Sequence, residues 1–170
     1  GSISYLRSTF TDFESFCTTG QTAAEGCFLP PPPAVETDAR QSLDGNDRPN
    51  APKWSGFLQL NYERPIGDNL IFGATANVQF KDDLGLLATD KTAIQDSYET
   101  YDANIRIGTA DGKWQLALIG KNLSDETAFR SAGNVPGTGG NTGTPEGYPS
   151  DLQGVYIRPR QVELELTWRY

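Results

Sequence analysis

The last ten residues of the chain, QVELELTWRY, alternate strictly between apolar and polar side chains. A period of two predicts a strand with one apolar face and one polar face. The apolar members are Val162, Leu164, Leu166, Trp168 and Tyr170. The pattern is typical of a barrel wall with lipid outside and water inside, and a half-buried strand of a water-soluble sheet shows it as well.

Five further segments carry a strand pattern, so the chain is expected to form about six strands. The predicted strands are residues 3–10, 53–65, 70–81, 98–109, 114–123 and 156–170. Helical periodicity is absent throughout. The sequence therefore predicts an all-β fold of antiparallel, up-and-down strands.

Short and long connections alternate between these strands. Residues 66–69 and 110–113 are predicted tight turns, and the second contains Asp-Gly, a strong hairpin signal. The long connections, rich in Gly, Pro, Asn, Ser and Thr, are residues 11–52, 82–97 and 124–155. Since successive connections of an up-and-down sheet lie at opposite ends, the long loops are expected at one end and the tight turns at the other. Outer-membrane barrels have this asymmetry, with long extracellular loops and short periplasmic turns.

Composition and charge exclude several classes of protein. No apolar run reaches the roughly 20 residues that a transmembrane helix needs. The 14 basic and 22 acidic residues give a net charge of -8, which argues against nucleic acid as a partner. The chain begins Gly-Ser-Ile and contains no methionine, so we expect a processed, tagged or excerpted piece of a longer protein.

Three segments resemble a known family of membrane proteins. They are PNAPKW at residues 49–54, DGKWQLALIGKNLSD at residues 111–125 and RPRQVELELTWRY at residues 158–170. Together they resemble the C-terminal barrel strands of a TonB-dependent outer-membrane receptor, over nearly the whole chain. The opening ISYLRSTFTDF and the loop that follows it resemble the strand and extracellular loop immediately upstream in this family.

This resemblance implies a fold, a location and a set of partners. Such receptors have a 22-stranded barrel filled by an N-terminal plug, and they import scarce nutrients such as ferric siderophores, cobalamin or glycans with energy supplied through TonB. Residues 1–170 would then be part of a barrel in the outer membrane of a Gram-negative bacterium. The expected partners are outer-membrane lipid, the remaining strands and plug, and the TonB complex through the missing N-terminal part.

The C-terminal strand has two compatible roles under this resemblance. A run of alternating apolar residues with a final aromatic residue resembles the signal that the barrel-assembly machinery reads. Under this resemblance, the assembly machinery would first recognise five residues of the strand, and the same residues would later face lipid. They are Val162, Leu164, Leu166, Trp168 and Tyr170.

A second function of a different class stays open. About six strands fall short of the eight that a closed membrane barrel requires, so both edges of the sheet would be open. Identical copies could pair through these edges, and a fragment derived from a receptor would then form an extracellular β filament or a multichain β assembly.

The sequence offers little catalytic chemistry. There are no histidines, which excludes Ser-His catalysis and imidazole metal sites, and acidic pairs such as Asp82-Asp83 are expected to be solvated charge. We therefore predict no enzyme, catalytic residue or cofactor. The Gly-rich residues 133–147 lack the pattern of a phosphate loop and indicate a surface loop. Asp44 and Asp47 offer oxygen ligands for calcium, but this segment more often marks a turn.

The two cysteines of the chain predict a disulfide. Cys17 and Cys27 lie in one long loop on the expected extracellular side. A disulfide is the natural inference in an oxidising compartment, and closing this loop would contribute on the order of 2 to 3 kcal/mol. It would protect the loop from proteases or form a rigid lip above a ligand.

The sequence does not identify the ligand, because the residues expected to contact it, such as Arg130, Tyr148 and Tyr156, are common residue types.

Overall fold

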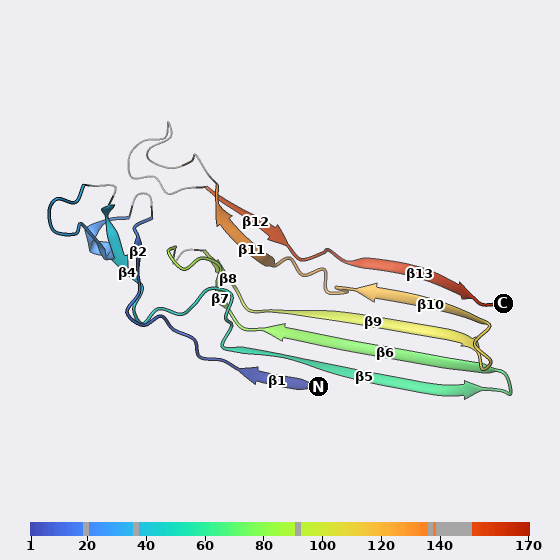
Figure 1. Cartoon of the computed structure of the whole chain (residues 1–170). Coiled ribbons are helices and arrows are strands. Elements are labelled where there is room, and N and C mark those ends of the chain that lie inside the picture. The colour runs from blue at the N-terminus through green and yellow to red at the C-terminus, as the bar shows by residue number, and fades with distance from the viewer. Residues whose placement is uncertain (19–20, 36–37, 91–92, 136–137, 139–150) are drawn as a thin grey trace.

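One long, curved sheet dominates the structure, a computed structural model that describes residues 1–18, 21–35, 38–90, 93–135, 138 and 151–170 (Figure 1). The sheet has six antiparallel strands in the order β1-β5-β6-β9-β10-β13. Their bounds are β1 Ser2–Tyr5, β5 Trp54–Ile66, β6 Leu70–Lys81, β9 Tyr98–Thr109, β10 Trp114–Lys121 and β13 Gln161–Trp168. The predicted all-β class and the up-and-down order of the six strands are confirmed.

Three predicted strands are shorter than the sequence indicated, and β10, which ends at Lys121 rather than at residue 123, differs least. β1 ends at Tyr5 rather than at residue 10, because the chain then leaves the sheet and forms an isolated bridge between Thr9 and Asp47. The predicted strand 156–170 is broken. Tyr156 belongs to a different strand, and β13 begins only at Gln161 after a segment that contains Pro159, which has no N–H to donate to a sheet. β13 also ends at Trp168, so Tyr170 lies beyond it.

The long connections contain small sheets that periodicity did not predict. The first connection forms a three-stranded sheet of β2 Glu14–Phe16, β3 Cys27–Phe28 and β4 Arg40–Ser42, with a short 3-10 helix at Ala23–Glu25. The second forms a hairpin of β7 Leu84–Gly85 and β8 Ile94–Gln95, and the third a hairpin of β11 Phe129–Asn134 and β12 Leu152–Tyr156. These strands have two to six residues, which is too few for a clear period of two.

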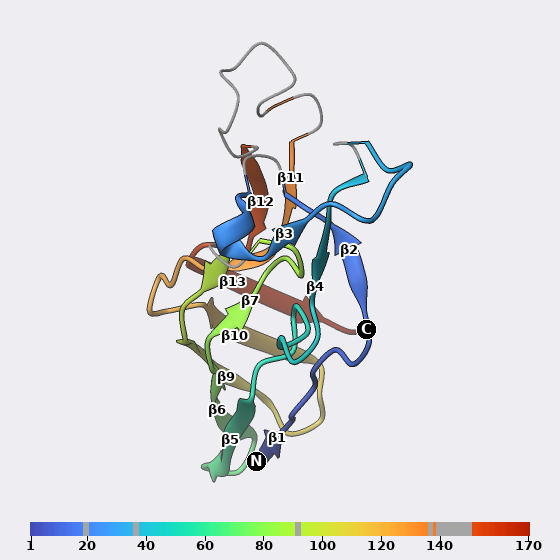
Figure 2. The ribbon, with the colours of Figure 1, turned by 90° about the vertical axis from the view of Figure 1, so that its left-hand side faces the viewer.

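All three long connections lie at one end of the sheet, as predicted. In Figure 1 the β2, β4, β7, β8, β11 and β12 elements gather beyond the same ends of the long strands, and the tight turns lie at the opposite ends. Figure 2, which views the molecule from the loop side, shows these small elements in front of the long strands. The loops therefore form a layer that covers one end of the sheet.

The β9–β10 turn shows how the tight turns are built. Gly112 has a positive φ of 70°, a conformation that glycine adopts without strain, and its N–H donates to the Thr109 carbonyl at 2.9 Å. Hydrogen bonds from the Thr109 hydroxyl and from Lys113 lower the pKa of Asp111 to about 2. The carboxylate form therefore stabilises the turn above the ordinary aspartate pKa, and this contribution disappears as the pH falls toward 2.

The sheet has almost no core of its own. Among the described residues the buried apolar side chains are Leu43, Leu86, Ala93, Ala117 and Ala128, and only Ala117 belongs to the long sheet. The others lie in or beside the loop layer. The loop layer therefore packs around small apolar centres, whereas the apolar side chains of the long strands remain exposed.

One ion pair on the polar face of the sheet reaches across an intervening strand. Arg106 on β9 reaches Glu63 on β5 at 2.8 Å, and it passes over Gly73 on the intervening strand β6. A Cβ atom at Gly73 would lie 2.6 Å from the Arg106 Cζ atom. Glycine at this position therefore lets the guanidinium group lie flat across β6.

Alanine substitutions at two glycines of the sheet are expected to lower the free energy of unfolding by different amounts. At Gly108 a Cβ atom would meet the Trp114 carbonyl oxygen at 2.7 Å and the Gln115 Cα atom at 3.2 Å. Since backbone cannot move aside as a flexible side chain does, G108A should lower the free energy of unfolding by about 1 to 3 kcal/mol. G73A displaces only the end of Arg106 and should cost about 1 kcal/mol or less, the value of an exposed ion pair. Chemical denaturation of both variants measures the difference, and equal costs would contradict this account.

Candidate functional site

One face of the long sheet is a continuous apolar surface. The strand register places Leu166, Leu116, Ile107 and Phe72 in one row across β13, β10, β9 and β6, and Leu164, Leu118, Ile105 and Ala74 in the next row. We call this surface the apolar face. Val162, Leu164, Leu166 and Trp168 all lie on it and are 63% to 71% exposed. The described part of the chain contains nothing that covers this face.

The strands of the apolar face are long, and aromatic residues lie near both of its ends. β5, β6 and β9 have 13, 12 and 12 residues, more than the roughly 9 to 11 that a tilted transmembrane strand needs, whereas β10 and β13 have eight each. Near the turn end, Trp114 pairs with Trp168 across β10 and β13. Near the loop end, the Tyr5 and Trp54 rings lie 4.7 Å apart. Between them, one row across the sheet contains only aliphatic and small residues, namely Leu60, Ala76, Ala103, Gly120 and Val162.

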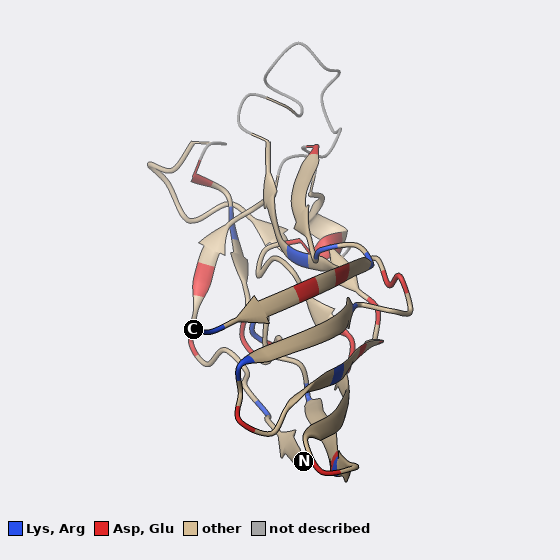
Figure 3. Cartoon of the chain, turned by 90° about the vertical axis from the view of Figure 1, so that its right-hand side faces the viewer, with Lys and Arg blue, Asp and Glu red and all other residues tan. Residues whose placement is uncertain are grey.

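The opposite face of the sheet is polar. Its rows contain Glu163, Asn104 and Thr75, and then Glu165, Arg106 and Glu63. In Figure 3 the strands are mainly tan, charged residues gather in loops and turns, and β13 carries acidic bands. The two faces of the sheet therefore differ in polarity, although the polar face also contains Phe57, Ile71, Ala117 and Ile119 and the apolar face contains Arg64.

A hydrogen-bonded cluster ties the end of β10 to the start of β13, and we call it the clasp. Asn122 adopts a left-handed conformation with a φ of 47°. Its Nδ2 group donates to the carbonyl oxygens of Glu126 at 2.8 Å and Arg158 at 2.9 Å, while its Oδ1 atom accepts from the Glu126 N–H at 2.9 Å and the Ser124 hydroxyl at 3.2 Å. The Asn122 side chain thus holds two segments more than 30 residues apart in the sequence.

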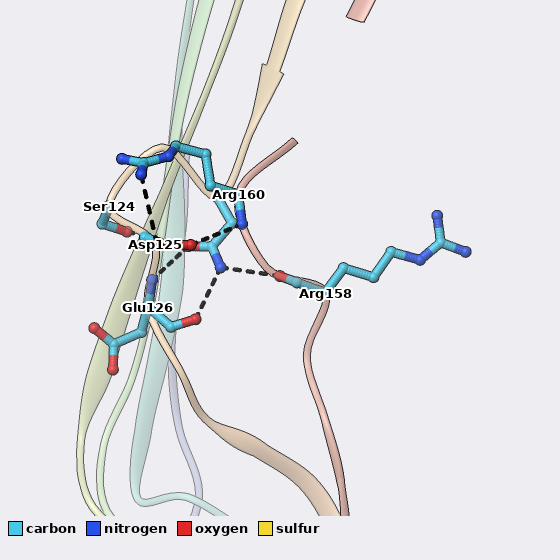
Figure 4. A network of polar contacts seen from close by, with 6 residues as sticks. Ser124, Asp125, Glu126, Arg158 and Arg160 are labelled. Carbon is cyan, nitrogen blue, oxygen red and sulfur yellow. Dashed lines mark hydrogen bonds and ion pairs between the residues drawn. The ribbon is translucent and has the colours of Figure 1, made fainter. Parts of the chain in front are cut away.

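Asp125 completes the clasp from the same turn. Its Oδ1 atom accepts from the Arg160 N–H at 3.0 Å, and its Oδ2 atom lies 3.5 Å from the Arg160 guanidinium. Figure 4 shows these contacts, with the Arg158 side chain directed away from the cluster. The segments NLSD at residues 122–125 and RPR at residues 158–160 therefore each supply one half of the clasp.

A hollow of about 800 Å³ lies beside the clasp. Its floor is the loop-proximal end of the polar face, and β11, β12 and the chain after β12 form its wall. The lining includes Lys81, Tyr98, Thr100, Asp102, Lys121, Phe129, Arg130, Tyr156 and Arg158. Arg130 and Tyr156, two of the expected ligand contacts, therefore line one hollow. Tyr148 lies outside the described residues, as does most of the Gly-rich segment 133–147.

The predicted disulfide is present in the first long connection. The Cys17 and Cys27 sulfur atoms are bonded at 2.00 Å, and the bond joins β3 to the residue that follows β2. Between them Glu25 accepts hydrogen bonds from the Thr22 N–H at 2.8 Å and the Thr22 hydroxyl at 2.9 Å, which lower the pKa of Glu25. The bond therefore closes a loop that already has ordered backbone contacts.

The acidic segment considered for calcium forms a turn. Gly45 has a φ of 76°, and the Asn46 N–H donates to the Leu43 carbonyl. Asp44 accepts from the Asp12 N–H at 3.2 Å, and Asp47 pairs with Lys53 at 3.1 Å, which raises the pKa of Lys53. No group of three or more His, Cys, Asp or Glu residues within the described ranges is placed to hold a metal ion.

Comparisons with protein-family models, curated proteins and solved structures found no match to this chain. Within the part of the chain that the structure describes, no helix has the length and apolar character needed to cross a membrane.

The clasp makes a testable contribution to stability. N122A should lower the free energy of unfolding by about 2 to 4 kcal/mol, because it leaves several backbone groups unpaired and places alanine in a left-handed conformation. N122G tolerates that backbone conformation and isolates the loss of the side-chain hydrogen bonds. Amide hydrogen exchange at Arg160, whose N–H donates to Asp125, and at Gln161, the first residue of β13, reports the clasp directly.

The matched control is N134A, which removes an exposed asparagine of β11 that is not part of the clasp. It should leave the exchange rates at Arg160 and Gln161 and the stability unchanged. Unchanged protection of these amides in N122G would show that the clasp does not hold β13 in place.

Proposed function

We propose that this chain is the C-terminal barrel-wall segment of a TonB-dependent outer-membrane receptor that imports a scarce nutrient of the ferric siderophore, cobalamin or glycan class. The observation that carries the proposal is the apolar face, which continues across the long strands while every long connection lies at one end. Lipid would cover the apolar face, and the polar face would line the aqueous interior. The loop layer would then be extracellular and the tight turns periplasmic.

The size of the apolar face supports a lipid surrounding. Five strands about 4.8 Å apart, over eight residues of about 3.3 Å each, cover on the order of 600 Å² in the plane of the sheet. Soluble monomers rarely expose apolar patches above a few hundred Å². At about 25 cal/mol per Å², contact of this area with water costs on the order of 15 kcal/mol, as much as the whole stability of a typical domain.

The open edges of the sheet support membership of a larger barrel. β1 and β13 each pair with one neighbour only among the described strands, and unpaired edges in a membrane leave backbone groups unsatisfied. The remaining strands and the plug of the receptor would complete the barrel, and TonB would act through the part of the receptor that this chain lacks. Val162, Leu164, Leu166, Trp168 and Tyr170 would serve the assembly machinery and then face lipid.

Two arginine substitutions in β13 test whether the protein lies in the outer membrane. Leu164 lies in the middle of the apolar face, whereas its neighbour Glu163 lies on the polar face. L164R in the native protein should reduce insertion into the outer membrane strongly, because an arginine at the bilayer midplane costs about 2 to 4 kcal/mol. E163R is the matched control and should insert normally. Fractionation of membranes and their resistance to urea extraction measure both, and equal insertion of the two variants would oppose the proposal.

A second candidate function rests on the same open edges. If the chain exists by itself, the β13 edge of one copy would pair with the β1 edge of the next, and copies would form an extracellular β filament or a multichain β assembly. The mass of the native polypeptide separates the two. A much larger chain with peptides upstream of Gly1 favours the receptor, while a product near 18.5 kDa that begins at Gly1 favours the assembly.

A further inference from the structure

Positive charge gathers in the hollow beside the clasp, although the chain as a whole is acidic. The hollow is lined by four basic residues and one acidic residue, namely Lys81, Lys121, Arg130, Arg158 and Asp102. The whole chain has 14 basic and 22 acidic residues. The charge of this site is therefore opposite in sign to the charge of the protein.

Three of the four cations have no carboxylate partner among the described residues. Lys121 lies 3.5 Å from Asp102, the single acidic residue of the lining. Within the described ranges no carboxylate lies within 4.0 Å of the Lys81, Arg130 or Arg158 charge. Three cationic groups are thus available to a ligand in one hollow.

The fold holds these cations from three different directions. Lys81 is the last residue of β6, and its Nζ atom lies 6.0 Å from the centroid of the Tyr98 ring. Arg130 belongs to β11 in the loop layer. Arg158 is fixed through its carbonyl oxygen, which accepts from Asn122 at 2.9 Å, and its side chain is directed away from the clasp (Figure 4). The backbone under each cation is therefore fixed before a ligand arrives.

Aromatic rings complete the wall of the hollow. The Phe129 and Tyr156 rings stack with centroids 4.4 Å apart and an interplanar angle of 28°, and both residues line the hollow. Phe129 directly precedes Arg130 in β11, and Tyr156 ends β12 two residues before Arg158. An apolar, planar surface therefore lies beside the cations. Such a surface suits the flat face of an unsaturated ring.

We propose that the hollow binds a small, multivalent anion that carries a planar ring. This inference rests on the proposed function, since it names the ligand class that the extracellular end of the receptor would admit. Bidentate hydrogen bonds from arginine match carboxylate or phosphate oxygens. A neutral ligand that filled the hollow would remove three cations from water without compensation, so an anion is the ligand that fits.

The probe for this site is benzene-1,3,5-tricarboxylate, a planar trianion, titrated calorimetrically into the full chain in non-ionic detergent. The trianion should bind with an affinity that falls as the salt concentration rises. Benzene-1,3,5-tricarboxamide has the same ring without charge and should bind at least tenfold more weakly. Citrate, which has three carboxylates without a ring, should bind more weakly than the aromatic trianion.

Substitutions assign the binding to the hollow. K81Q, R130Q and R158Q should each lower the association constant for the trianion by about tenfold or more, as expected for loss of a charged hydrogen-bond donor. The control R64Q removes a cation of β5 that does not line the hollow and should leave the constant unchanged. Circular dichroism checks that each variant keeps its strand content.

Three results would overturn the ligand class: no binding of the trianion, equal binding of the neutral amide, or equal loss in R64Q and the three hollow variants. The location of the protein is measured separately by membrane fractionation. A protein that inserts normally but fails to bind the trianion would refute this inference and leave the proposed receptor function intact. A protein that binds the trianion but does not insert would refute the receptor function alone.

Discussion

The fold depends on a sheet whose apolar face has no partner within the described chain. The register aligns leucine, isoleucine, phenylalanine and tryptophan side chains across neighbouring strands, and the polar face opposite offers no alternative core. A soluble sheet hides such a face against a second layer. Here the second layer is the loop layer, and it covers an end of the strands rather than their face. The described residues therefore provide little hydrophobic burial for the long strands.

The clasp gives the far edge of the sheet a fixed position without a hydrophobic core. A single side chain, Asn122, pairs with backbone groups on both sides of the long third connection. Asp125 adds a contact to the Arg160 backbone and guanidinium. These polar contacts set where β13 begins, and they allow the residues between them to form a separate hairpin above the sheet.

The same arrangement links the sheet to the hollow. The clasp uses the backbone of Arg158 and leaves its guanidinium group to line the hollow. β6 ends at Lys81 on the floor, and β11 brings Arg130 to the wall. Lys81, Arg130 and Arg158 follow no pattern in the sequence. They form one cationic surface because three separate segments of the chain meet at the same corner of the sheet.

The sequence alone determined the strands, their two faces and the ends at which the connections lie, because a period of two and tight-turn residues such as Asp111-Gly112 act locally. It also indicated the disulfide between Cys17 and Cys27. Only the tertiary structure decided how the segment around Pro159 is held before β13, since Arg158 and Arg160 contact Asn122 and Asp125 in a distant segment. It also decided the short strands of the loop layer, whose two to six residues carry no readable period. The gathering of Lys81, Arg130 and Arg158 in one hollow is likewise a product of strand order and register, which place residues far apart in the chain side by side.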